Sequence, residues 1–147
     1  MVTVFEDAIA TLLEPISDLL ENPKVSEIMI NGPKEIFVEQ GGLVYRVPNQ
    51  FRGEEELMAA FRSIAQSVGR VIDNENPRLD ARLPNGSRIH VVLPPMARKG
   101  TTVAIRKFSK EKLNLGDLIR FGSLSREGAR FLDICIHLGK NVLVSGG

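Results

Sequence analysis

One segment of the sequence predicts a β-hairpin together with its register. Residues 78–93 alternate between polar and apolar positions in two runs that meet at the turn residues 84–86, Pro-Asn-Gly. A two-residue loop would pair Arg82 with Ile89 and bring charge beside the apolar face. A three-residue loop, with the glycine at positive φ, instead pairs Ala81 with Ile89 and keeps the apolar side chains together. We therefore predict the three-residue loop.

This register separates the side chains of the hairpin onto two faces. The face predicted to be buried carries Leu79, Ala81, Leu83, Ile89 and Val91. The opposite face carries Arg78, Asp80, Arg82, Arg88 and His90. Guanidinium groups match phosphate oxygens and stay charged at physiological pH, so this face, with Arg106 from the next predicted strand, is a candidate phosphate site. The alternative is a solvated strand face on which Asp80 pairs with an arginine or with His90.

Periodicity and turn residues place the other elements. We predict two helices within residues 3–20, the second starting at Pro15; strands at 25–30, 35–40 and 42–47 in a meander; a helix that starts at the solvated acidic residues 54–56 and ends at Gly69; a strand at 101–108; helices at 113–121 and from Ser125 to Gly139; and an apolar strand at 142–147. The predicted fold class is α+β. We divide the chain into N-terminal helices (1–22), a sheet domain (23–108) and a helical segment leading into a second domain (109–147).

Composition excludes several classes of function. A net charge of +1 and an aromatic content of 5% argue against a nucleic-acid surface. Two histidines and one cysteine do not make a metal cluster, so we expect no metal site. No apolar run approaches the roughly 20 residues of a membrane span, so we predict no transmembrane segment.

The last residues have the pattern that precedes a phosphate-binding loop. Residues 142–147, Val-Leu-Val-Ser-Gly-Gly, read as a buried strand running into a glycine pair. A P-loop continues such a pair to a lysine that contacts phosphate and a Ser or Thr that binds Mg²⁺. Those residues do not follow here, so we expect no nucleotide hydrolysis by this polypeptide alone. An ordinary strand and turn is the alternative interpretation.

Three segments, occurring in one order, resemble a known family. They are residues 79–90 (Leu-Asp-Ala-Arg-Leu-Pro-Asn-Gly-Ser-Arg-Ile-His), 101–108 (Thr-Thr-Val-Ala-Ile-Arg-Lys-Phe) and 142–147. Over roughly residues 16–147 the chain is similar to the motor ATPases of type II and type IV secretion, nearest to the CpaF-like ATPases of tight-adherence pili. The resemblance implies a PAS-like N-terminal domain with a mixed or antiparallel sheet, then a helical linker and the first strand of a RecA-like domain.

The resemblance also implies residue roles and partners. Arg88 and Arg106 match family positions that contact nucleotide at a domain or subunit boundary, with Arg82 a weaker third candidate, and Gly146 and Gly147 match the start of Walker A. The implied full-length protein is a hexameric ATPase that uses ATP and Mg²⁺ for protein export or pilus assembly. It lies in the cytoplasm, peripheral to the inner face of the cytoplasmic membrane, beside inner-membrane secretion or pilus proteins. For this segment alone we expect no tightly bound cofactor. A stand-alone PAS-like sensor or protein-interaction domain is the alternative function.

Overall fold

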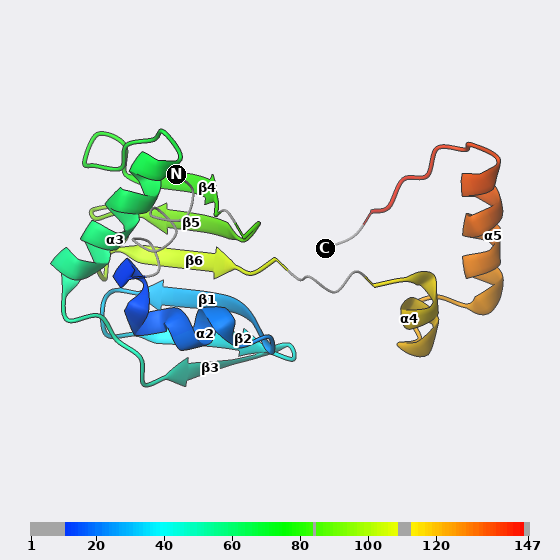
Figure 1. The fold of residues 1–147 in the computed structure, drawn as a ribbon, viewed down its shortest axis with the longest axis horizontal. Coiled ribbons are helices and arrows are strands. Elements are labelled where there is room, and N and C mark those ends of the chain that lie inside the picture. The colour runs from blue at the N-terminus through cyan, green and yellow to red at the C-terminus, as the bar shows by residue number, and fades with distance from the viewer. Residues whose placement is uncertain (1–10, 84, 109–112, 146–147) are drawn as a thin grey trace. The chain divides into compact units, whose positions relative to one another are not determined.

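The computed structural model describes residues 11–83, 85–108 and 113–145. The chain forms two compact units, Met1–Ser109 and Lys110–Gly147, which we describe separately (Figure 1). None of the described helices is long and apolar enough to cross a membrane.

The first unit is built on a six-stranded antiparallel sheet with the order β3-β2-β1-β6-β5-β4 (Figure 1). Its strands are β1 Val25–Asn31, β2 Ile36–Gln40, β3 Leu43–Val47, β4 Arg78–Arg82, β5 Arg88–Val92 and β6 Thr102–Arg106. Two consecutive three-stranded meanders, β1 to β3 and β4 to β6, are joined where β1 pairs with β6. The predicted meander and hairpin are confirmed, and the sheet is antiparallel throughout these pairs rather than mixed.

The hairpin has the predicted register. Ala81 is the cross-strand partner of Ile89, and Arg82 is the partner of Arg88. Gly86 has a φ of +86°, a conformation that side chains other than glycine rarely adopt. Pro84, the other residue that the loop prediction depends on, lies outside the described residues.

Helices cover one face of the sheet. They are the 3₁₀-helix η1 Glu14–Ile16, α2 Ser17–Glu21 and α3 Glu54–Ser67. Their apolar residues join the inward-facing strand residues in one buried cluster, which includes Ile16, Phe61, Ile28 and Ile105. Pro15 stands at the start of η1, where its missing N–H breaks no helical bond. Residues 3–10 of the first predicted helix lie outside the described residues, and the next two residues, 11 and 12, are helical.

The acidic start of α3 is more than a solvated first turn. Glu54 accepts a 2.7 Å hydrogen bond from the backbone N–H of Thr101, just before β6. Glu56 accepts a 2.6 Å hydrogen bond from the backbone N–H of Arg52. The interpretation of residues 54–56 as merely solvated was therefore wrong for Glu54, because its partner Thr101 is 47 residues away and leaves no local signal.

The second unit contains α4 Leu115–Arg120 and α5 Arg126–His137. Asn114 caps α4 by accepting from the N–H of Asp117, and Ser125 caps α5 as predicted. The predicted strand at 142–147 is not present: residues 141–145 belong to no strand, and residues 146–147 are outside the described part. Leu143 and Val144 are 93% and 91% exposed. An apolar strand needs a neighbouring strand for its N–H and C=O groups, and the described residues of this unit supply none. The start of a RecA-like domain is accordingly not evident.

Candidate phosphate-binding site

Three arginines stand side by side on the sheet face opposite the helices. Arg82 is the cross-strand partner of Arg88, and Arg88 is the partner of Arg106. All three are exposed. Neighbouring strands lie about 4.8 Å apart, so the backbone positions of this arginine row span about 10 Å across β4, β5 and β6. The row therefore presents three guanidinium groups from one rigid surface.

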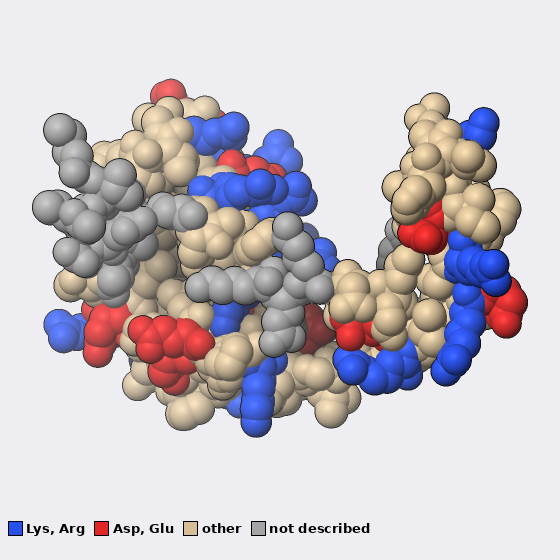
Figure 2. All heavy atoms as spheres, turned by 45° about the vertical axis from the view of Figure 1, so that its right-hand side comes forward, with Lys and Arg blue, Asp and Glu red and all other residues tan. Residues whose placement is uncertain are grey.

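The row continues into acidic residues on the other meander. Arg106 is also the cross-strand partner of Glu27 on β1, and Glu27 is the partner of Glu39 on β2. The sheet face is thus basic on β4 to β6 and acidic on β1 and β2. The space-filling view shows Lys and Arg atoms gathered on the sheet unit, with acidic atoms nearby (Figure 2).

Asp80, the carboxylate on the same face of β4, forms no ion pair with the arginine row. Asp80 pairs with His90, its partner across the hairpin, with Oδ2 3.1 Å from Nδ1. The expected alternative, an Arg-Asp pair at Asp80, does not form. Among the residues that the structure describes, Arg82, Arg88 and Arg106 make no ion pair. Like charges on directly opposed strand positions repel, so Arg88 is repelled by both of its cross-strand partners, Arg82 and Arg106.

A hydrogen bond joins the residue before Arg88 to a residue that follows Arg106. The buried hydroxyl Oγ of Ser87 accepts a 3.2 Å hydrogen bond from the backbone N–H of Phe108. The backbone N–H of Ser87 donates in turn to Oδ1 of Asn85 at 3.0 Å, which fixes the turn. The relative position of the two arginines is therefore set by the sheet and by this side-chain bond.

Lys107, although adjacent to Arg106, serves the opposite face. Its Nζ donates hydrogen bonds to the carbonyl oxygens of Leu19, at 3.3 Å, and Asn22, at 2.6 Å, at the end of α2. Desolvation by burial lowers the pKa of Lys107. A cation is favoured at a helix C-terminus, so Lys107 has a structural role and does not extend the arginine row.

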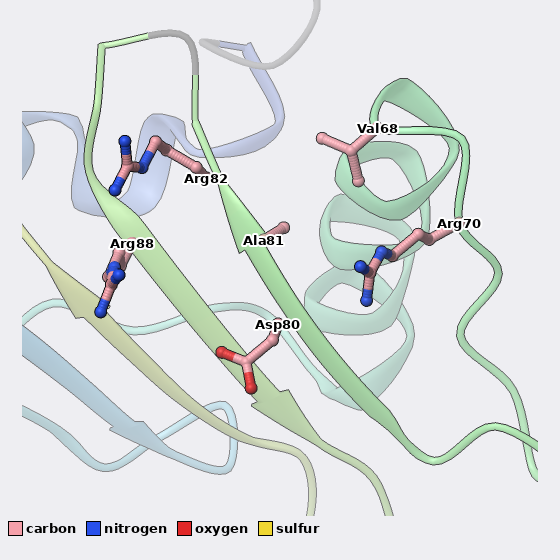
Figure 3. Close-up of a pocket in the computed structure, with 6 residues that line it drawn as sticks. All are labelled: Val68, Arg70, Asp80, Ala81, Arg82 and Arg88. Carbon is pink, nitrogen blue, oxygen red and sulfur yellow. The ribbon is translucent and has the colours of Figure 1, made fainter.

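An open hollow of about 600 Å³ lies beside part of the row, at the β4 edge of the sheet. Its lining residues are Val68, Arg70, Asp80, Ala81, Arg82 and Arg88 (Figure 3). Arg70 comes from the turn after α3 and lies on the other side of β4 from Arg82 and Arg88 (Figure 3). Sequence reasoning missed Arg70, because only the packing of α3 brings this turn to the edge of the hairpin. Arg106 does not line the hollow.

Two other predictions concern the terminal glycine pair and a metal site. Gly146 and Gly147 lie outside the described residues. Within the described ranges there is no cluster of three or more His, Cys, Asp or Glu residues that could hold a metal ion.

Comparison with known proteins gives matches over most of the chain. The sequence profile of the family described as type II/IV secretion system protein matches residues 10–147. An uncharacterized protein of Methanocaldococcus jannaschii is 36% identical over 134 residues, which are 87% of this chain and 19% of that protein. The type IV secretion system protein VirB11 of Brucella suis is 36% identical over 113 residues, or 75% of this chain and 31% of VirB11. The chain thus spans less than a third of each of these two relatives.

A solved structure agrees with this fold. The crystal structure of the VirB11 ATPase from the Brucella suis type IV secretion system, in complex with sulphate, superposes with a TM-score of 0.68 at 33% identity. The match covers 78% of this chain and 36% of that one. The α+β fold with its antiparallel sheet corresponds to the N-terminal region of VirB11.

Proposed function

Because this chain belongs to the type II/IV secretion system protein family, we propose that it positions nucleotide phosphates for a secretion motor ATPase. Arg88 and Arg106 contact the phosphates of ATP held at a boundary with another domain or subunit, and Arg82 assists them. The observation that carries this proposal is the row of three guanidinium groups, which are adjacent in register and make no ion pair among the described residues.

The chemistry of phosphoryl transfer explains the use of such a row. Negative charge develops on the oxygens of the transferring γ-phosphoryl group, and arginines supplied in cis or from a neighbour stabilise it. Donors that are fixed before the reaction need no reorganisation during it. The sheet and the Ser87–Phe108 hydrogen bond fix the backbone positions from which Arg88 and Arg106 extend. The related VirB11 ATPase was crystallised with sulphate, a tetrahedral anion similar to phosphate.

The finer assignment follows from the three segments 79–90, 101–108 and 142–147 in their order. We propose a CpaF-like ATPase of pilus assembly or protein export, active as a homo-hexamer with ATP and Mg²⁺. It works at the inner face of the cytoplasmic membrane beside inner-membrane secretion proteins. Residues 109–147 lead into its ATPase domain.

Steady-state ATP turnover by the full-length gene product tests the role of the arginines. Arg88→Ala and Arg106→Ala should each lower kcat by about 10³-fold or more if these side chains stabilise the transferring group. Arg78→Ala is the matched control, because Arg78 is exposed on the same sheet face but is paired with Val92 rather than with an arginine. Melting temperatures show whether each variant is folded. Folded Arg88 and Arg106 variants that turn over ATP at the wild-type rate would remove the proposed role.

The reading frame after Gly147 tests the assignment of residues 109–147. It should encode a sequence close to Thr-Gly-Ser-Gly-Lys followed by Thr or Ser, which completes the phosphate-binding loop. A different sequence there would exclude the lead into an ATPase domain without affecting the test of the arginines.

A further inference from the structure

Phe108 lies one position beyond the arginine row, on the same face of the sheet. Arg106 and Arg88 are cross-strand partners, and alternate residues along a strand share a face. The next outward positions are therefore Phe108, after Arg106, and Gly86, before Arg88. The contact between them confirms this placement: a Cβ atom built on Gly86 would lie 3.2 Å from Cγ of the Phe108 ring.

The ring of Phe108 is anchored but not buried. Its backbone N–H is bonded to the buried Ser87, and the ring lies against Gly86, the residue of the turn without a side chain. Even so, Phe108 is 58% exposed, whereas Phe51 and Phe61 in the core are 1% and 0% exposed. An apolar ring held in place with so much of its surface in water is available to a planar ligand.

The spacing suits a ligand with an anionic end and an aromatic end. Two residues of extended chain cover about 7 Å, so the backbone position of Phe108, just after β6, is about that far from the backbone position of Arg106. One aromatic ring is enough to hold a base, because a base can stack on a single aromatic side chain through either of its faces. An anion without an aromatic part would use the arginine row and leave Phe108 uncovered.

We propose that Phe108 stacks on the base of the nucleotide whose phosphates the arginine row contacts. This inference rests on the proposed function and adds the residue that recognises the nucleoside end. Stacking depends on a flat aromatic surface rather than on the hydrogen-bonding groups of one base. The site should therefore favour a nucleoside triphosphate over a bare triphosphate chain, while ATP and GTP gain similarly from Phe108.

The test compares ligands with and without a base on the full-length gene product. Equilibrium dissociation constants are measured for ATP, GTP and inorganic tripolyphosphate with the wild type, Phe108→Tyr and Phe108→Leu. Stacking is worth about 1–3 kcal/mol per base, so Phe108→Leu should weaken ATP and GTP by about fivefold or more and leave tripolyphosphate unchanged. Phe108→Tyr keeps the ring and should retain the preference for ATP. Phe121→Leu, at another exposed phenylalanine (60%), should leave all three constants unchanged.

A measurement on the wild type keeps the proposal testable if Phe108→Leu is unstable. The ring proton resonances of Phe108 should shift on addition of ATP and stay in place with tripolyphosphate, because only the base brings a ring current. Equal weakening of ATP and tripolyphosphate by Phe108→Leu, or no weakening and no base-dependent shift, would overturn the stacking role. Failure of the proposed function looks different: Arg88→Ala and Arg106→Ala would leave tripolyphosphate binding at its wild-type value.

Discussion

The backbone N–H of Thr101 donates a 2.7 Å hydrogen bond to Oε1 of Glu54, which joins the start of β6 to the first turn of α3. Thr101 is fully buried, so no water replaces this acceptor if the carboxylate is removed. The bond therefore holds the helical layer on the strand that carries Arg106.

Glu54→Ala should lower the free energy of unfolding by about 1.5–3 kcal/mol, the range for a hydrogen bond to a charged group. Urea denaturation measures the effect. Glu55→Ala is the matched control, because Glu55 is exposed in the same helical turn and loses the same interaction with the helix dipole. Equal destabilisation by the two substitutions would show that the bond to Thr101 contributes nothing.

Gly86→Ala should destabilise the fold by more than Gly42→Ala. Both glycines have positive φ, at +86° and +79°, so both alanines bring backbone strain of about 1–2 kcal/mol. Only at Gly86 does the new Cβ also press on the Phe108 ring, since nothing lies within 4 Å at Gly42. Adding Phe108→Ala should relieve that excess, which a double-mutant cycle measured by chemical denaturation would detect. Additive effects at the two positions would contradict the contact.

Arg88→Gln should raise the free energy of unfolding at low salt by up to about 1 kcal/mol. Arg88 stands between Arg82 and Arg106, and like charges on opposed strand positions repel. Arg106→Gln should give less or no gain, because Arg106 also loses the attraction of its other partner, Glu27. Denaturation in 1 M NaCl should remove the difference between the variants, since the screening length there falls to about 3 Å. A stability loss on neutralising Arg88 would argue against repulsion in the row.

Lys107 should make stability depend on pH in the alkaline range. Its pKa in the folded protein is lowered from 10.5 by desolvation, so just below pH 10.5 the unfolded chain binds the proton more tightly than the folded one. The free energy of unfolding therefore gains a contribution that rises with pH in that window and is constant below it. The difference in stability between the wild type and Lys107→Arg isolates this contribution, because arginine stays protonated. A difference that is flat or falls as the pH approaches 10.5 would rule out the shift.

The register of the hairpin could be predicted from the sequence, because its alternation and its turn residues agree on one pairing. The faces of Arg82 and Arg88 followed from that register. The adjacency of Arg88 and Arg106 required the pairing of β5 with β6, which periodicity alone does not supply. The same limit hid Arg70, whose place depends on how α3 packs, and the bond from Thr101 to Glu54, whose partners are 47 residues apart.

At residues 142–145 the sequence predicted a strand that the structure does not contain. Their apolar sequence has the composition of a buried strand, yet they form none among the described residues of their unit. Composition reports how a segment would pack if a neighbouring strand were present, and pairing decides whether it does.

The junction of β1 with β6 differs from the other strand pairs in how far apart its strands lie in sequence. Every other pair of adjacent strands is consecutive in sequence, whereas Ile28 meets Ile105 only after a long stretch of chain has been brought together. Local hairpins close quickly and distant contacts close slowly, so we expect each half of the sheet to form before the halves meet. We therefore expect Arg106 to meet its acidic neighbour Glu27 in the last step, which completes the charged surface.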